Sequence, residues 1–316
     1  MSSIKDFILT IIRKPLGIKR LIEETEELRL QIDRFNYEVR RHQLIEHILH
    51  DTEKGITSDK YTDHEIIVSL TTFGKRIYDV AFTIESIMQQ SMKANRIILW
   101  LDYSFEGKRL PQFIQYQQKR GLEVAYCKDL RSYKKLIPAL HRYPDAAIIT
   151  IDDDALYEPD LLERLIVPYL EDSQYIYCHR FHKMSFDENG QILPYLQWQW
   201  HCKDDTPSHL NFPTGVGGVL YPPHSLDDEV INEDVFMDIC KYADDIWLKA
   251  MAIKKGTLVK KVFSRSELSE EYLINSAVQD IGLRNINAMG EMLNDKQLKA
   301  VFTKYNLYDK LKEWNQ

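Results

Sequence analysis

Three adjacent carboxylates stand near the middle of the chain, directly after an apolar run. Asp152, Asp153 and Asp154 follow residues 147–151, which are apolar except for one threonine and predict a buried strand. Adjacent carboxylates repel one another and destabilise a fold unless a cation compensates them. Hard oxygen ligands suit Mg²⁺ or Mn²⁺, which retain water molecules and bridge to substrate phosphates. The cluster therefore predicts a divalent metal on Asp152 and Asp154, with a solvated acidic turn as the alternative.

A second acidic pair, Asp244 and Asp245, follows about ninety residues further along the chain. A reaction in which a hydroxyl group attacks needs one general base beside that hydroxyl, and a carboxylate can serve. An Asp at the start of a helix is also held in place by the backbone N–H groups that it caps. Asp245 is thus the candidate base with Asp244 as its neighbour, and a helix cap without chemistry is the alternative.

Alternating apolar runs and helical patterns form the framework around these carboxylates. Buried strands are predicted at residues 66–70, 96–102, 122–127 and 147–151, and helices between them at 78–90, 109–120 and 133–142. This alternation is typical of βαβ units, which form a mostly parallel sheet with helices on both faces. Ligands of such sheets bind outside the carboxyl ends of the strands, where Asp102 and Asp152 fall.

Residues 194–223 are rich in aromatic residues, glycine and proline, and predict ordered loops around a site. Gly217 and Gly218 allow the backbone to approach a ligand closely, so we expect them beside the bound substrates. Trp198 and Trp200 could stack on a sugar ring. A tight turn between strands is the alternative for the glycines, and ordinary strand packing is the alternative for the tryptophans.

The region before residue 50 has the pattern of one long helix. Apolar residues recur there at alternating three- and four-residue intervals, with a threonine in one slot: Ile18, Leu21, Thr25, Leu28, Ile32, Phe35 and Val39. About three heptads of this spacing predict a helical arm that associates with a second copy through a coiled coil. One amphipathic helix docked on the globular domain is the alternative.

Residues 1–20 carry five basic residues and one acidic residue around a short apolar run. The run is too short to span a bilayer, but it could rest on the anionic inner face of a membrane. A helix end packed on the protein itself is the alternative. We therefore expect a cytoplasmic protein that could contact the inner membrane face.

Composition sets limits on the class of protein. The 316 residues are 44% hydrophobic and 28% charged, with a net charge of −7, so the chain has no overall attraction for nucleic acid. The four scattered cysteines have no metal-ligand spacing and are expected to be reduced. The predicted domains are a helical arm over residues 1–62, a catalytic α/β domain over 63–265, and a C-terminal helical segment over 266–316.

In their order and spacing, these motifs resemble the inverting family 2 glycosyltransferases of the GT-A fold, especially bacterial capsule and surface-polysaccharide transferases. Ser69–Phe73 stands where the family has its first-strand loop, and Thr83–Gln90 resembles the helix that follows. Asp152–Asp154 matches the D-x-D motif, and Asp244–Leu248 matches the E-D-x-x-L box with Asp in place of Glu. The resemblance covers roughly residues 65–260. The Q-x-x-R-W element of processive synthases is absent.

The resemblance implies a role for each matching residue. Asp152 would contact the nucleotide ribose or the metal, Asp154 would bind the metal, and Asp245 would be the base. Thr71 and Asp102 would line the pocket for a uracil ring.

Three further residues are assigned to the substrate site. Asp153 lies between the two metal-binding carboxylates of the motif. Lys134 and Lys135 begin the helix before the D-x-D strand and could neutralise diphosphate charge, with a solvated face as the alternative.

The expected activity is transfer of a sugar from a nucleotide sugar, most simply a UDP-sugar, to a saccharide or lipid-linked saccharide, with Mn²⁺ or Mg²⁺ as cofactor. A metal-dependent nucleotidyltransferase is one alternative. It would need a basic triphosphate-binding loop beside the first strand, where the chain has only Lys75 and Arg76. A scaffold that binds sugar nucleotides without turnover is the other alternative.

Overall fold

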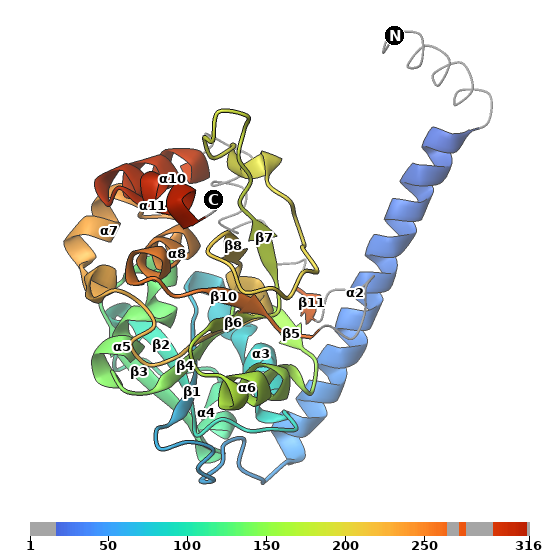
Figure 1. Cartoon of the computed structure of the whole chain (residues 1–316). Helices are drawn as coiled ribbons and strands as arrows, with labels where there is room; N and C mark the ends of the chain where they lie inside the picture. The colour runs from blue at the N-terminus through green and yellow to red at the C-terminus, as the bar shows by residue number, and fades with distance from the viewer. Residues whose placement is uncertain (1–16, 264–271, 276–292, 315–316) are drawn as a thin grey trace.

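The computed structural model describes residues 17–263, 272–275 and 293–314. The chain has an α/β fold in which a mostly parallel sheet carries helices on both faces, with a long N-terminal helix along one side (Figure 1). In these described ranges, no helix is both long and apolar enough to cross a lipid bilayer. The predicted membrane-facing segment 1–20 lies outside the described residues except for its last four.

The central sheet has seven strands in the order β10-β6-β9-β4-β1-β2-β3. Their bounds are β1 (Ile66–Thr71), β2 (Arg96–Asp102), β3 (Leu122–Cys127), β4 (Ala147–Thr150), β6 (Ile176–Cys178), β9 (Val219–Tyr221) and β10 (Val259–Lys261). Neighbouring strands are parallel except for β9, which is antiparallel to both β4 and β6. The first four strands confirm the predicted ones to within one residue, because apolar runs of this kind are buried on both faces of a parallel sheet.

Helices pack on both faces of this sheet (Figure 1). Their bounds are α2 (Ile18–His50), α3 (Val80–Met88), α4 (Gln112–Lys119), α5 (Ile137–Arg142), α6 (Leu161–Glu171), α7 (Glu233–Ile239), α8 (Asp244–Lys255), α10 (Leu293–Lys304) and α11 (Leu307–Trp314). Alternate residues of β1 divide between two cores. Ile67 belongs to the core that includes residues of α5, α8 and α10, and Val68 to the core that includes residues of α2, α3 and α6.

Two predicted helices begin with a 3-10 turn rather than as regular α-helix. The 3-10 helix η1 (Gly74–Tyr78) precedes α3, and η3 (Arg131–Lys135) precedes α5. Both turns lie between the carboxyl end of a strand and the start of a helix, so their side chains lie near both. Arg76 lies on η1 and Lys135 lies on η3.

The segment from residue 266, predicted to be helical throughout, contains a strand. Tyr272–Ile274 forms β11, which is antiparallel to β5 (Ala155–Tyr157) directly after the acidic cluster. Aromatic and branched residues favour strands, and the otherwise unpaired edge of β5 offers them a ladder. Helices α10 and α11 confirm the prediction for residues 293–314. A third, two-stranded sheet pairs β7 (Phe181–Lys183) with β8 (Asn211–Pro213).

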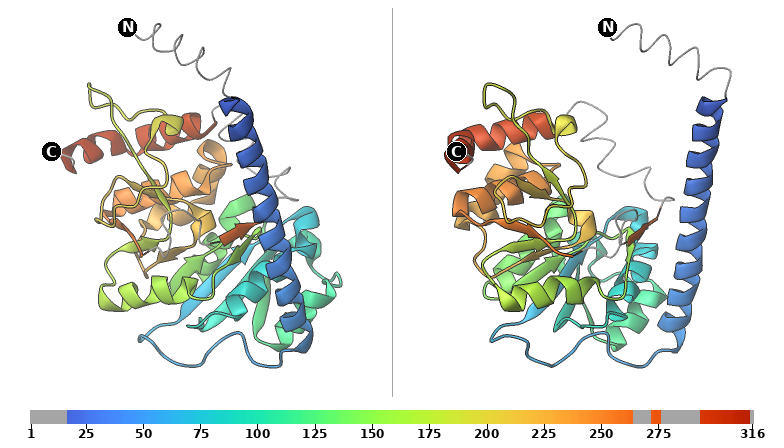
Figure 2. Two further views of the ribbon diagram at one scale, coloured as in Figure 1. Left: turned by 90° about the vertical axis from the view of Figure 1, so that its right-hand side faces the viewer. Right: turned by 45° about the vertical axis from the view of Figure 1, so that its right-hand side comes forward.

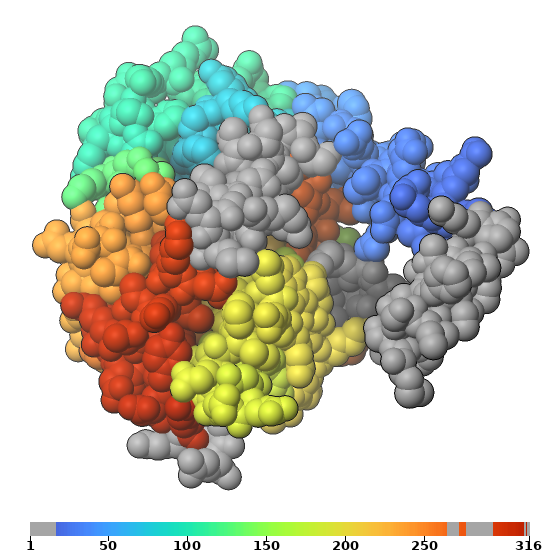
Figure 3. Space-filling model, turned by 90° about the horizontal axis from the view of Figure 1, so that it is seen from above, coloured from blue at the N-terminus to red at the C-terminus, as the bar shows by residue number. Residues whose placement is uncertain are grey.

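Helix α2 is 33 residues long and meets the body only along its last third (Figures 1 and 2). Tyr37, Leu44 and Ile48 are buried in the same core as α3, whereas every residue from 19 to 36 is exposed. From above, α2 lies at the side of the molecule away from α10 and α11 (Figure 3). Docking and projection are therefore both present in one helix, and the boundary predicted at residue 62 stays a prediction.

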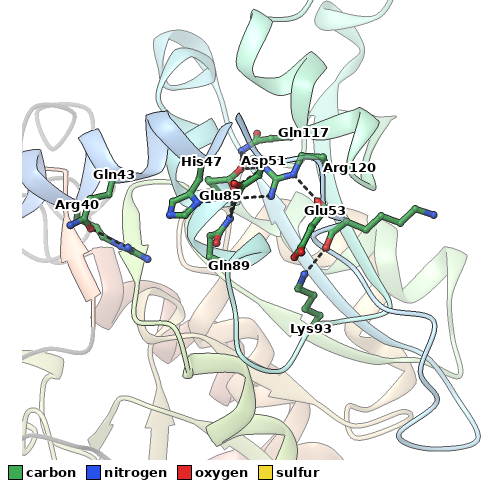
Figure 4. Close-up of polar contacts among 11 residues, drawn as sticks. Arg40, Gln43, His47, Asp51, Glu53, Glu85, Gln89, Lys93, Gln117 and Arg120 are labelled. Atoms are coloured by element: carbon green, nitrogen blue, oxygen red, sulfur yellow. Dashed lines mark hydrogen bonds and ion pairs between the residues drawn. The ribbon is translucent and has the colours of Figure 1, made fainter. Parts of the chain in front are cut away.

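A buried ion pair lies in the body of the protein beside the C-terminal end of α2 (Figure 4). Glu85 of α3 is fully buried, and Nη1 of Arg120 donates to both of its carboxylate oxygens at 2.8 and 2.9 Å. The Gln89 amide donates to Glu85 and to Asp51, the residue that follows α2, at 2.8 Å each. Nδ1 of His47 also lies 2.8 Å from the Asp51 carboxylate. The end of the helix is thus tied to a charge network inside the body.

We predict that Glu85→Gln lowers the free energy of unfolding by about 3–5 kcal/mol, because it leaves a buried guanidinium without its carboxylate. Denaturant titration measures the change. The matched control is Glu65→Gln, since Glu65 and Arg96 form a partly exposed pair at 2.8 Å. That change should cost less than about 1 kcal/mol. Equal losses in the two variants would contradict the special role of the buried pair.

Candidate active site

The acidic cluster lies where the strand order of the sheet reverses. Strand β1 has β2 on one side and β4 on the other, so the connections diverge and leave a crevice at the carboxyl ends of β1 and β4. Thr72 follows β1 and Asp152–Asp154 follow β4, at the two sides of this crevice.

Asp153 and Asp154 are held by the turn that follows β1. Asp153 is buried and accepts hydrogen bonds from the Thr72 hydroxyl at 2.6 Å and from Nη1 of Arg76 at 2.7 Å. The same Nη1 lies 3.2 Å from Oδ2 of Asp154. Burial raises the pKa of Asp153, and Arg76 and Thr72 oppose that effect. The side chain of Asp153 therefore anchors the turn from inside, and its assignment to substrate stays a prediction.

Asp152 points to a different cation. Nζ of Lys135 lies 3.0 Å from Oδ1 of Asp152 and 3.0 Å from Oδ2 of Asp244, at the start of α8. Burial disfavours the charged amine, but Asp152 and Asp244 outweigh burial and hold the pKa of Lys135 well above its ordinary value. One buried ammonium group thus joins the two acidic motifs that the sequence places about ninety residues apart.

Gly215 brings the backbone of the glycine-rich loop against this group. Its N–H donates to Oδ2 of Asp245 at 3.3 Å. A Cβ atom at this position would lie 2.6 Å from Nζ of Lys135, 3.2 Å from Oδ1 of Asp152 and 3.4 Å from Oδ1 of Asp245. Only glycine fits there without displacing the amine. Sequence reasoning missed Gly215; its place at the start of the glycine-rich stretch was the available signal.

Asp245 has an altered acidity. Burial is the main cause, the charge of Asp244 adds to it, and together they raise the pKa of Asp245 to about 7, although Lys135 acts in the opposite direction. A carboxyl group with a pKa near the working pH can accept a proton and later release it. The predicted base therefore lies beside Lys135 and the Gly215 N–H, in an environment that suits that role.

The residues predicted to line a nucleoside pocket lie at the ends of β1 and β2. The Thr71 hydroxyl donates to the Trp100 carbonyl at 2.8 Å. Nζ of Lys134 lies 3.7 Å from Oδ2 of Asp102 and 3.2 Å from Oδ1 of Asp129. The two adjacent lysines thus serve different carboxylates. Neither lies on a solvated face, since Lys134 is 1% and Lys135 is 6% exposed.

The predicted aromatic platform is only partly available. Trp198 is buried, its Nε1 donates to the Leu193 carbonyl at 2.8 Å, and its ring packs edge-on against Phe212. Trp198 therefore packs in the core of this structure, and its stacking on a ligand stays a prediction. Trp200 is half-buried and stacks on His182 with ring centroids 4.5 Å apart.

Gly217 and Gly218 face protein rather than the carboxylates. A Cβ at Gly217 would lie 3.0 Å from Cβ of Arg180, and one at Gly218 would lie 3.6 Å from side-chain atoms of Leu161 and Leu165. Gly218 also has a φ of 85°, which favours glycine. The missing side chains at these two positions make room for chain packing, and their approach to a ligand stays a prediction.

The charges of the site favour an added cation. Five carboxylates surround the two cations Arg76 and Lys135, namely Asp152, Asp153, Asp154, Asp244 and Asp245. Within the described ranges, no group of three or more acidic, histidine or cysteine residues is placed to hold a metal by itself. Mg²⁺ often takes only one or two protein carboxylates and completes its shell with water and substrate phosphates. Asp152 and Asp154 fit that pattern, because Asp153 is used internally.

Comparison with known proteins gives structural similarity but no sequence match. No protein-family model matches the sequence, and a search of curated proteins found no match. The crystal structure of residues 1–349 of TarS from S. aureus in complex with UDP is similar over 66% of this chain and 59% of that chain, with 14% identity and a TM-score of 0.41. Because this likeness is weak, the activity has to be inferred from the residues of the site.

We predict that Lys135→Met lowers the free energy of unfolding by about 3–5 kcal/mol near neutral pH, because it leaves buried carboxylates uncompensated. The loss should be smaller at about pH 5 than at about pH 8, since carboxyl groups with raised pKa values take up protons as the pH falls. Denaturant titration at both pH values measures this. Lys128→Met, at an exposed pair with Glu233, should leave stability unchanged. A Lys135→Met protein as stable as the wild type would contradict the bridging role.

Proposed function

We propose that the protein is an inverting, metal-dependent glycosyltransferase that moves a sugar from a UDP-sugar to a saccharide or lipid-linked saccharide acceptor in surface-polysaccharide assembly. The observation that carries the proposal is the meeting of both acidic motifs at Lys135. One motif supplies carboxylates that suit a metal and a diphosphate, and the other supplies a carboxylate with a pKa near neutrality. The resemblance of the two motifs to those of family 2 transferases supports the same activity.

In this proposal the donor binds across the switch point of the sheet. Thr71 and Asp102 contact the nucleoside at the ends of β1 and β2, and Asp152 lies nearer to the diphosphate. Asp154, together with Asp152, would hold Mn²⁺ or Mg²⁺, which supplies charge compensation for the leaving diphosphate when it is bound. Arg76 keeps the metal-binding turn in place through Asp153, so it acts as a positioning residue.

The transfer step assigns the proton to Asp245. The acceptor oxygen forms a bond to the anomeric carbon while the bond from that carbon to the diphosphate oxygen breaks, and the hydroxyl proton passes to the Asp245 carboxylate. The Gly215 N–H donates to Oδ2 of Asp245 and so orients the carboxylate. Oδ1 of Asp245 then lies on the side of Gly215 where a Cβ atom would otherwise stand. Asp244 remains paired with Lys135, which keeps the second negative charge of the motif compensated.

Two other functions remain as alternatives. A nucleotidyltransferase would need a basic loop beside β1 that binds the triphosphate. Arg76 is buried between Asp153 and Asp154, so Lys75 is the one exposed basic residue of the pair. A scaffold that binds sugar nucleotides without turnover would have no use for a carboxyl group with a pKa near 7. Release of the nucleoside diphosphate separates these functions from the proposed one.

We predict that chelation of divalent metal with EDTA abolishes turnover and that Mn²⁺ or Mg²⁺ restores it. Asp154→Asn should lose donor binding in calorimetry together with activity, because the amide has no negative charge for the metal. Asp238→Asn, at an exposed carboxylate of α7, is the matched control and should bind the donor as the wild type does. Full activity in chelator would contradict the metal assignment.

We predict that Asp245→Asn lowers kcat by roughly two to four orders of magnitude, the usual contribution of a general base. Asparagine keeps the shape of the side chain but cannot take the proton. Binding of the UDP-sugar should change little, because the metal and phosphate contacts lie on the other acidic motif. A retained kcat would reduce Asp245 to a helix-start residue, and loss of donor binding would move it into the metal site.

A further inference from the structure

The first two thirds of α2 display large apolar side chains to solvent. Leu21, Leu28, Ile32 and Phe35 are exposed by 63, 57, 50 and 68%. A single helix with such residues is marginally stable in water, and clustered exposed apolar residues mark an interaction surface. In the right-hand view of Figure 2 this part of the helix stands clear of the body.

The docked face and the exposed apolar face lie on opposite sides of α2. At 100° per residue, the buried Tyr37, Leu44 and Ile48 fall on one side of the helix. Ile32 and Val39 fall roughly opposite to them, and Val39 is still 42% exposed where the helix meets the body. Among the described residues, docking on the body therefore leaves the apolar face exposed as far as Val39.

The residue types along this face indicate how many helices would associate. In heptad notation the first apolar positions are Ile18, Thr25, Ile32 and Val39, all branched at Cβ. The second positions begin with Leu21, Leu28 and Phe35. Among parallel coiled coils, Cβ-branched residues at the first position with leucine at the second favour two helices over three or four.

The charges beside the apolar face favour a parallel alignment of two helices. In a parallel pair, Glu24 of one helix lies beside Arg29 of the other, because the flanking positions five residues apart face each other. An antiparallel pair that overlaps the whole face would instead bring Glu24 beside Glu38 and Arg29 beside a second Arg29. Opposite charges attract only in the parallel arrangement.

We propose that α2 pairs with α2 of a second copy of this chain as a parallel, two-stranded coiled coil. The bodies then attach to the outer sides of the pair, because each docks through the face opposite the shared one. The network around Glu85 and Arg120 fixes the end of each helix to its own body (Figure 4), so the two active sites keep a set orientation on the dimer. This pairing does not depend on the activity proposed above.

Light scattering on the full chain across a dilution series tests the pairing. The wild type should have twice the chain mass of 37.3 kDa, and Leu28→Glu or Ile32→Glu should raise the dissociation constant at least about a hundredfold, since each places a charge in an apolar seam. Leu30→Glu is the matched control, because Leu30 is 61% exposed on the same helix but off the seam, and should leave the mass unchanged. Circular dichroism of all variants verifies that the body is folded. A monomeric or trimeric wild type, or equal effects at Leu28 and Leu30, would overturn the proposal.

A charge-reversal cycle tests the direction. Glu24→Arg and Arg29→Glu should each weaken the dimer, by roughly threefold to tenfold, and the double variant should recover the wild-type dissociation constant. In an antiparallel pair Glu24→Arg would relieve a repulsion. A Glu24→Arg protein that associates as tightly as the wild type, or more tightly, would overturn the parallel alignment.

Discussion

One buried ammonium group holds the candidate site together. Lys135 reaches Asp152 at the end of β4 and Asp244 at the start of α8, with 3.0 Å to each, and its own backbone belongs to the turn before α5. Without this cation the two acidic motifs would repel each other across the crevice. The absence of a side chain at Gly215 follows from the same constraint, because a Cβ there would lie 2.6 Å from the amine.

The site is built with an excess of negative charge, and this excess explains several of its properties. Arg76 compensates Asp153 and Asp154 from one side, and Lys135 compensates Asp152 and Asp244 from the other. Asp245 lies beside the second of these groups, and burial together with the charge of Asp244 raises its pKa. Such a site favours a divalent cation together with a substrate that carries phosphate charge, and it keeps one carboxyl group able to exchange protons near neutral pH.

The framework could be predicted from sequence because its signals are local. The apolar runs that became β1 to β4 are packed between helices on both sides, and the first acidic motif follows closely on the end of β4. Contacts between distant segments could not be predicted in this way. The pairing of β9 between β4 and β6 and the approach of Gly215 to Lys135 depend on where a loop returns in space. The enclosure of Trp198 beside Phe212 depends on such contacts as well, because residue type alone does not tell which aromatic rings of a loop are buried.

Helix α2 shows that docking and projection are compatible within one helix. Its buried residues and its exposed apolar residues occupy opposite faces, so the docked-helix alternative holds for its C-terminal part, and association with a second copy stays a prediction. The C-terminal part of α2 contributes Tyr37, Leu44 and Ile48 to a core that also contains residues of α3. The same core contains Ile151 and Ala155, which flank the acidic cluster. The arm and the α/β body therefore share one core, although the candidate site lies at the carboxyl ends of β1 and β4.

The most direct test of the central claim is a screen of UDP- and GDP-sugars for release of nucleoside diphosphate by the wild type in the presence of Mn²⁺. A site in which Asp152, Lys135 and Asp245 act together predicts release from at least one UDP-sugar, accelerated by a saccharide acceptor and lost in Asp245→Asn. Binding of sugar nucleotides without any release would contradict the claim and favour a scaffold, and release of pyrophosphate from a nucleoside triphosphate would contradict it in favour of nucleotidyl transfer.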